Sequence, residues 1–202
     1  MTLRTGILLL VSGPSGSGKT TLCRRLADED EAHYSISCTT RAPREGEIHG
    51  RDYHFLDPTD FAKRIEAGEF LEHAEVHGNH YGTLKSEVLD YLAKGRDVVM
   101  DIDVQGAQLV RACDDSEIQK ALLELFVMPA SEEELRARLT GRGTDAEEVI
   151  ALRMKNSLEE MAHWQEYTYR LISATREEDY LNFKSLLLAE RLKVSRLSST
   201  TQ

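Results

Sequence analysis

The stretch that decides the fold is Ile7-Leu8-Leu9-Leu10-Val11-Ser12, followed directly by Gly13-Pro14-Ser15-Gly16-Ser17-Gly18-Lys19-Thr20. A short apolar run with a β-branched content predicts a buried strand, and the spacing of Leu22 and Leu26 after the turn predicts a helix. The turn has the spacing G-x-x-x-x-G-K-T of the phosphate-binding P-loop. Because the match lies between a strand and a helix, it predicts a site for a nucleoside triphosphate.

Each part of this loop has a role in binding phosphate. Glycines let backbone N–H groups converge on an anion, and the start of the following helix adds the positive end of its dipole. Lys19 can reach the outer phosphates, and the Thr20 hydroxyl can ligate Mg²⁺ as the expected cofactor. The expected ATP-binding residues are Gly13, Pro14, Ser15, Gly16, Ser17, Gly18, Lys19 and Thr20.

Composition excludes several classes of protein. A chain of 202 residues is long enough for one domain with inserted subdomains. The net charge of −10 argues against a nucleic-acid coat, which needs a basic face. The three cysteines, Cys23, Cys38 and Cys113, include no C-x-x-C pair and predict neither a disulfide framework nor a zinc site. With no membrane-spanning apolar run and no secretory signal, we expect a cytoplasmic protein without a membrane partner, and no oligomeric state is predicted.

The alternation of strands and helices along the chain predicts a doubly wound parallel sheet. Residues 35–94 are strand-rich and are expected to form an insertion, with strands at 35–40, 52–56, 70–76 and 80–83 and helices at 58–68 and 84–94. The core is expected to cover residues 1–34, 95–140 and 157–194, with strands at 98–103, 122–127 and 171–172 and helices at 104–112, 131–139 and 178–193. Residues 141–156 are expected to form a helical lid, within a helix that runs from 145 to about 167, and residues 195–202 a frayed tail.

A second phosphate site is suggested by two arginines, Arg41 and Arg44, with Tyr53 nearby. Planar guanidinium groups bind phosphate oxygens in pairs, and a phenol adds one donor. By itself the pattern is equally typical of surface arginines. Next to a P-loop, it indicates a phosphorylated acceptor.

Together these motifs resemble the guanylate kinase family over nearly the whole chain. The motifs that carry the resemblance are residues 13–20, residues 37–53, Phe70-Leu71-Glu72 with Tyr81-Gly82-Thr83, residues 101–106 and Gly141-Arg142-Gly143-Thr144. The resemblance implies a P-loop NTPase fold and Mg²⁺-dependent phosphoryl transfer from ATP to GMP. It assigns the acceptor phosphate to Arg41, Arg44, Tyr53 and Tyr81, and the guanine and nearby groups to Ser37, Glu72, Thr83 and Asp103.

The chemistry of guanine supports the assignment of Glu72 independently. Guanine offers two donors on one edge, its N1–H and its 2-amino group, and a carboxylate accepts both. Adenine would leave the carboxylate unpaired in a dry pocket, and sites of this kind can reject such an analogue by about 10⁴-fold. Without the motif around it, Glu72 would be one of many surface glutamates.

The lid is expected to deliver positive charge to the transferred phosphoryl group. Glycines on both sides of Arg142 allow a hinged closure, and the resemblance implies catalytic roles for Arg142 and Arg153 beside Lys19. Arg138 is more typical of a solvated or ion-paired helix face. The chain departs from the family at Ser173-Ala174, where an Asn-Asp pair near the ATP adenine is frequent.

Two alternatives remain beside a guanylate kinase. A related P-loop kinase could act on another phosphorylated acceptor, against which the set Ser37, Glu72 and Thr83 argues. A catalytically inactive guanylate-kinase-like module could bind partner proteins, but such modules tend to lack the intact Gly18-Lys19-Thr20 that is present here.

Overall fold

The computed structural model describes residues 4–76, 78–140 and 147–197, and within them the chain forms two sheets. The larger sheet has five strands in the order β2-β7-β1-β8-β9, and every pairing in it is parallel. Its strands are β1 (Leu8–Ser12), β2 (His33–Tyr34), β7 (Val98–Asp101), β8 (Leu122–Met128) and β9 (Tyr169–Ile172). The predicted α/β class with a parallel sheet is confirmed.

Helices cover both faces of this sheet, because the side chains of β1 alternate between two apolar clusters. Leu9 and Val11 pack with α1 (Lys19–Asp28) and α8 (Arg176–Arg191). Leu8 and Leu10 pack on the other face, in the cluster that holds α3 (Lys85–Leu92), α4 (Val104–Arg111) and α5 (Ser116–Ala121). A strand buried on both faces is apolar at every position, and this explains the continuous apolar run in the sequence.

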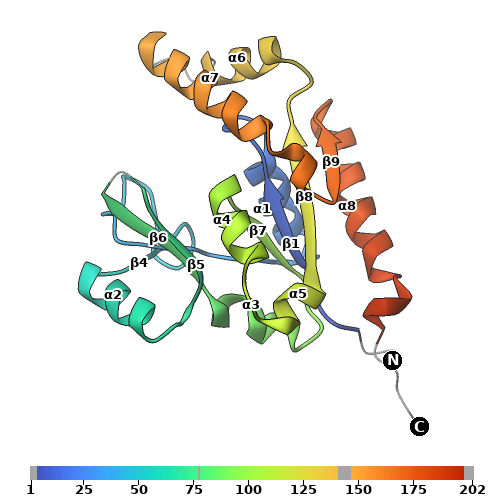
Figure 1. The fold of residues 1–202 in the computed structure, drawn as a ribbon. Helices are drawn as coiled ribbons and strands as arrows, with labels where there is room; N and C mark the ends of the chain where they lie inside the picture. The colour runs from blue at the N-terminus through green and yellow to red at the C-terminus, as the bar shows by residue number, and fades with distance from the viewer. Residues whose placement is uncertain (1–3, 77, 141–146, 198–202) are drawn as a thin grey trace.

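The smaller sheet lies to one side of the core, together with α2 (Figure 1). Its strands, in the order β4-β3-β6-β5, are β3 (Cys38–Thr39), β4 (His54–Phe55), β5 (Phe70–Val76) and β6 (Asn79–Leu84). The helix α2 (Pro58–Glu66) begins as predicted, since Asp57 caps it by accepting from the Thr59 amide at 2.8 Å. Phe61 of this helix stacks on Phe70 with ring centroids 4.3 Å apart and forms the small core of the sheet.

The strand predicted at residues 35–40 is confirmed only at Cys38–Thr39, because the chain passes from one sheet to the other within this segment. The Ser35 amide donates to the Val99 carbonyl of β7, whereas the Ser37 carbonyl accepts from the His54 amide of β4. β2 therefore ends at Tyr34 in the larger sheet and β3 begins at Cys38 in the smaller one. The helix α3 carries Val88 and Leu92 into the core cluster of the larger sheet, and the division of the chain at residue 94 stays a prediction.

Two helices differ from the predictions. The six-residue α5 is not among the predicted helices, although Asp115 supplies a cap for the Glu117 amide at 2.9 Å. The helix expected to run to about residue 167 ends earlier: α7 covers Glu147–Met161 and a 3₁₀ turn follows at Trp164–Glu166. The break lets Tyr167 turn inward and contact Phe126 edge-to-face, with centroids 5.0 Å apart.

α6 covers Glu132–Thr140. None of the helices in the described ranges is long and apolar enough to cross a bilayer.

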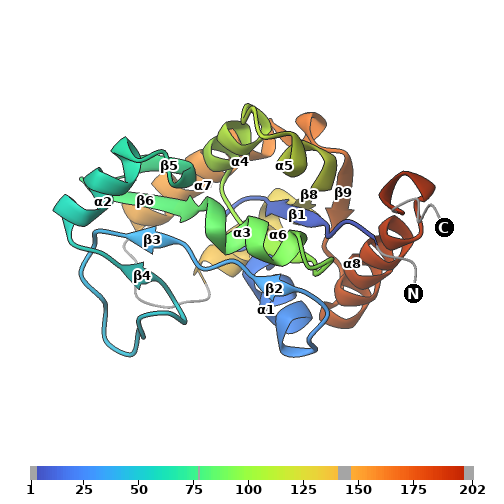
Figure 2. The same cartoon turned by 90° about the horizontal axis from the view of Figure 1, so that it is seen from below.

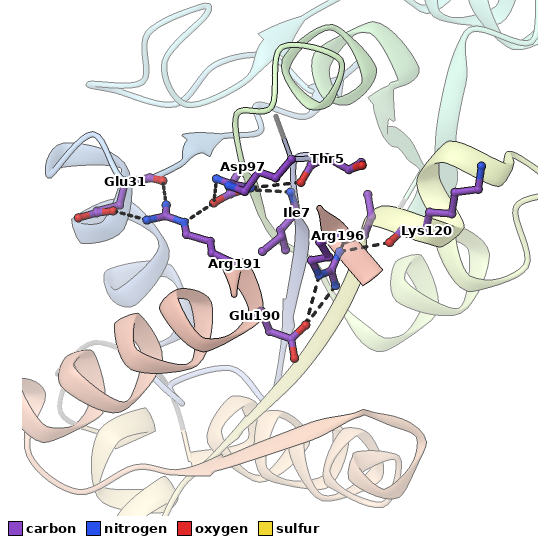
Figure 3. Close-up of polar contacts among 10 residues, drawn as sticks. Thr5, Ile7, Glu31, Asp97, Lys120, Glu190, Arg191 and Arg196 are labelled. Carbon is purple, nitrogen blue, oxygen red and sulfur yellow. Dashed lines mark hydrogen bonds and ion pairs between the residues drawn. The ribbon is translucent and has the colours of Figure 1, made fainter. Parts of the chain in front are cut away.

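The prediction of a frayed end is wrong for residues 195–197, where Arg196 is buried (Figure 3). Its guanidinium donates to three carbonyls at the end of α5, those of Lys120, Ala121 and Leu122, each at 3.2 Å. It also pairs with the Glu190 carboxylate at 3.2 Å, and its own carbonyl accepts from the Thr5 amide. The residues after α8 are therefore bonded to the segment before β1 and to the start of β8.

A second ion network lies beside it and holds α8 to β7. The buried Asp97 accepts from the Ile7 amide at 2.8 Å and from Arg191 at 2.8 Å. Arg191 also pairs with Glu31 at 2.8 Å (Figure 3). Loss of a cationic partner from such a buried carboxylate is expected to destabilise the fold, because it leaves a buried charge uncompensated.

Glu190 offers a direct comparison of a buried and an exposed ion pair. Arg196→Met leaves the nearly buried Glu190 carboxylate without its inner partner, and we expect it to lower the free energy of unfolding by about 3 kcal/mol. Lys193→Met is the matched control, because Lys193 pairs with the same carboxylate at 2.5 Å but is 51 % exposed. We expect this control to lose about 1 kcal/mol or less. Equal losses in urea denaturation would contradict a structural role for Arg196.

Candidate active site

The loop of residues 13–18 joins β1 to α1 and passes close to the end of β8. A Cβ atom on Gly13 would lie 2.2 Å from the Val127 carbonyl oxygen, and the φ angle of Gly13 is 149°. The loop ends at Gly18, with a left-handed φ of 94°, directly before Lys19 begins α1. Glycine is required at both places because a side chain would collide in the first and strain the backbone in the second. The amino-terminal end of α1 therefore lies at the carboxyl edge of the larger sheet.

Lys19 and Thr20 lie beside Asp101, the last residue of β7. The Thr20 hydroxyl donates to Asp101 Oδ2, and Lys19 Nζ lies 4.0 Å from Asp101 Oδ1. Carboxyl ends of parallel strands meet at the ligand-binding edge of such a sheet. A hydroxyl and a carboxylate are hard oxygen donors, and Mg²⁺ is commonly bound by one or two such groups together with substrate phosphates. The donor set at Thr20 therefore fits Mg²⁺.

A cavity of about 670 Å³ lies next to the loop, between α1, α6 and the start of α8. Arg25 forms its wall by pairing with both oxygens of Glu177, at 2.9 and 3.0 Å, and by lying 4.0 Å over the ring of Tyr180. Ser173 and Ala174 line the same cavity. Because it opens directly beside Lys19 and Thr20, it can hold the rest of a nucleotide whose phosphates lie on the loop.

Arg138 is bound to the phosphate loop, which the sequence did not predict. Its guanidinium donates to the carbonyls of Gly16 and Ser17 at 3.4 and 3.3 Å and to Ser173 Oγ at 3.0 Å. The Ser173 hydroxyl in turn donates to Asp179 at 2.7 Å. The departure from the family at residue 173 thus places a hydroxyl between Arg138 and α8. The one sequence signal for this role is the position of Arg138 next to the predicted lid.

α7 brings a second arginine to the same loop. Arg153 Nη2 donates to Ser15 Oγ at 3.1 Å. Figure 1 shows α6 and α7 above the carboxyl end of the larger sheet, on the side of the phosphate loop. Arg142, the other predicted lid arginine, lies outside the described residues. The catalytic roles of Lys19, Arg142 and Arg153 stay predictions.

The residues predicted to bind guanine are brought together where β5 and β6 pair. Glu72 lies opposite Thr83 in the register of the two strands, and Ser37 Oγ is 3.2 Å from Thr83 Oγ1. Burial raises the pKa of Glu72 to about 7, opposed by a hydrogen bond from Thr83 and assisted by the nearby charge of Asp103. Asp103 itself caps α4 by accepting from the Gly106 amide at 2.7 Å. A carboxyl group whose pKa is raised close to neutral by burial and by a neighbouring charge is typical of a binding site.

The residues predicted to bind the acceptor phosphate lie on the neighbouring part of the small sheet. Tyr53 and Tyr81 meet edge-to-face with centroids 6.1 Å apart, and the Arg41 guanidinium is 5.6 Å from the ring of Tyr53. Arg41 pairs with both oxygens of Glu47, at 2.9 and 3.1 Å, and this pairing raises the pKa of Arg41. The Arg44 side chain is exposed, and its amide donates to the same glutamate at 2.7 Å. Glu47 is therefore the carboxylate partner of Arg41 in this structure, a role that was not predicted from the sequence.

The chain is similar to known proteins over most of its length. A sequence model of the family described as guanylate kinase matches residues 5–190. The chain belongs to the guanylate kinase family. It is 46 % identical over 194 residues to a guanylate kinase of Cereibacter sphaeroides, which covers 96 % of this chain and 90 % of that protein. It is 44 % identical over 194 residues to a guanylate kinase of Ruegeria pomeroyi, with the same two coverages.

The fold agrees with this family. The crystal structure of guanylate kinase from Anaplasma phagocytophilum superimposes with a TM-score of 0.77 and 31 % sequence identity, covering 98 % of this chain and 93 % of that one. The predicted family and the P-loop NTPase fold are confirmed. The individual assignments of Ser37, Glu72 and Thr83 and of Arg41, Tyr53 and Tyr81 stay predictions that their proximity supports.

The raised pKa of Glu72 has a consequence for stability. The folded protein holds the Glu72 proton more tightly than the unfolded chain, so ionisation costs folding free energy as the pH rises from 4.5 through about 7. We expect Glu72→Gln to be more stable than the wild type at pH 8, by about 1–3 kcal/mol, and this difference to shrink toward pH 4.5. Chemical denaturation at several pH values measures it. Glu75→Gln is the matched control, because Glu75 is exposed on the same strand; an equal pH-dependent gain in both variants would argue against burial of Glu72 as the cause.

Proposed function

We propose that the protein transfers the γ-phosphoryl group of ATP to GMP and releases ADP and GDP. The observation that carries the proposal is the short segment after β7. Asp101 contacts Thr20 of the phosphate loop, and Asp103, two residues later, lies close enough to Glu72 to raise its pKa. One turn of chain therefore links the proposed donor site to the proposed acceptor site, and phosphoryl transfer needs two phosphate groups in line and in contact.

In the proposed reaction the donor phosphates are held by backbone N–H groups of the phosphate loop at the start of α1 and by Lys19. Thr20, beside Asp101, would hold Mg²⁺, which would supply positive charge to the donor phosphates. Arg41, Arg44, Tyr53 and Tyr81 orient the phosphate of GMP, whose own oxygen is the nucleophile. Since that oxygen is already an anion, the reaction needs no general base from the protein.

The arginines near the loop neutralise the charge that develops during transfer. Arg153 is already within hydrogen-bond distance of Ser15, and the proposal assigns it, with Arg142, to the transferred group. Arg138 binds two carbonyls of the loop rather than pointing away from it, so we assign it the positioning of the loop.

The alternatives are less well supported. A non-catalytic interaction module does not need Lys19, Thr20 and Asp101 held together at a strand end, yet these residues are in contact. A kinase for a sugar phosphate does not need a carboxyl that burial and Asp103 perturb, bonded to Thr83, whose hydroxyl in turn meets that of Ser37.

A panel of acceptors tests the function directly. With ATP and Mg²⁺, we expect GMP to be phosphorylated with kcat/KM at least about 10³-fold above that of AMP, CMP or UMP, because the guanine edge alone offers two donors to Glu72. Coupled detection of ADP measures all four reactions. Equal rates with the four nucleotides, or no rate above the ATPase background with any of them, would refute the proposed function.

Glu72→Gln tests how the base is read. The amide keeps the size of the side chain but replaces one acceptor by a donor, so GMP loses a charge-assisted hydrogen bond worth about 1.5–3 kcal/mol. We expect kcat/KM for GMP to fall by roughly 10- to 100-fold, and that for AMP to fall less, because adenine N1 can accept from the new amide. The measured quantity is the ratio of the two efficiencies in wild type and variant. A ratio that does not move would mean that another group reads the base.

A further inference from the structure

The chain leaves the larger sheet for the smaller one within three residues, and each of them has a different partner. The Ser35 amide donates to Val99 of β7, and the Ser37 carbonyl accepts from His54 of β4 at 2.9 Å. Between them, the Ile36 amide donates to Glu87 Oε1 at 3.2 Å. Figure 2 shows this passage between β2 and β3, and the return passage between β6 and α3. A side chain thus holds the residue at which the chain changes sheets.

Glu87 joins groups from both sides of this passage. Its Oε1 atom is 2.7 Å from His33 Nε2 of β2, and its Oε2 atom is 3.9 Å from His54 Nε2 of β4. The His33 ring is fixed in turn by a parallel stack on Tyr91 of α3, with centroids 3.7 Å apart. Burial opposes the ionisation of Glu87, but hydrogen bonds from His33 and the Ile36 amide outweigh it and hold the pKa of Glu87 below its usual range.

The next residue after the held amide is Ser37, which lies in the proposed guanine pocket. Its hydroxyl is 3.2 Å from Thr83 Oγ1, and Thr83 lies opposite Glu72. We propose that Glu87, with His33 and His54, forms a positioning cluster that fixes the passage and thereby holds Ser37 toward the acceptor base. The three side chains act through the backbone of Ile36 and Ser37. The inference rests on the proposed function, because GMP is the ligand whose binding the cluster favours.

The cluster is expected to affect binding of the acceptor and not the chemical step. When Glu87 loses its charge, the passage samples other conformations, and GMP binds only the fraction in which Ser37 is in place. The phosphate loop and Asp101 are held by other contacts, so the donor site does not share this effect. A residue with a general structural role would instead change all kinetic constants together.

Steady-state kinetics of Glu87→Gln separate these cases. We expect KM for GMP to rise about tenfold, while kcat and KM for ATP stay within about twofold of the wild type. Asp90→Asn is the matched control, since Asp90 is exposed on the same helix, and it is expected to change none of the three. His33→Phe keeps a ring on Tyr91 but removes the bond to Glu87, and it should raise KM for GMP in the same direction. An unchanged KM for GMP in both folded variants, or an equal rise for ATP, would overturn the cluster's role.

Hydrogen exchange of the Ile36 amide tests the cluster without using the enzymatic activity. In the wild type we expect this amide to exchange at least about 100-fold more slowly than the amides of the exposed residues Glu45 and Gly46, because it is bonded to Glu87. In His33→Phe it should exchange faster, while the Ser35 amide, bonded to β7, stays protected. Rapid exchange of Ile36 in the wild type would exclude the cluster. Slow exchange in a protein that does not phosphorylate GMP would instead refute the proposed function alone.

Discussion

The close approach of Gly13 to the backbone of β8 is the constraint on which the rest of the site depends. Because a Cβ atom at this position would lie only 2.2 Å from the Val127 carbonyl oxygen, no other residue allows the chain to turn there. The turn lets α1 begin directly above the carboxyl edge of the sheet, so that the helix dipole and Lys19 face the same space. Because β1 is the central strand, its neighbours β7 and β8 then deliver their own ends to the loop.

Two aspartates, Asp101 at the end of β7 and Asp103 just after it, place negative charge at this edge of the sheet. Asp101 is paired with Lys19 and accepts a hydrogen bond from Thr20, whereas Asp103 adds its charge to the field around Glu72. The carboxyl that we propose to read guanine is therefore held in an arrangement that disfavours its own ionised form. Such a cost to folding is common at binding sites, where the ligand rather than the protein supplies the missing partners.

Local signals explain what could be predicted from the sequence. The strand, loop and helix around residues 7–28 follow from neighbouring residues, as does the cap of α2 at Asp57. The proposed guanine set was predictable only through the resemblance of its motif, since Glu72 meets Thr83 by strand pairing and Ser37 meets Thr83 by a contact distant in sequence. Arg196 and Arg138 were not predictable, because their partners are 76 and 122 residues away in the chain. The split of residues 35–40 between two sheets has the same cause, since β-propensity does not specify which strand a segment pairs with.

The pairing of the arginines explains how a protein with a net charge of −10 can bind two polyanions at one edge. Arg41 is neutralised by Glu47, and Arg138 is neutralised by Glu134 while it binds the carbonyls of the phosphate loop. Each cation is thereby kept near the site without repelling its neighbours. A phosphate that binds Arg41 replaces Glu47 as its partner, so part of the attraction is offset by the pair that is broken. Under the proposed function, the same exchange favours a doubly charged phosphate over a singly charged carboxylate, because the ligand has to compete with Glu47 for Arg41.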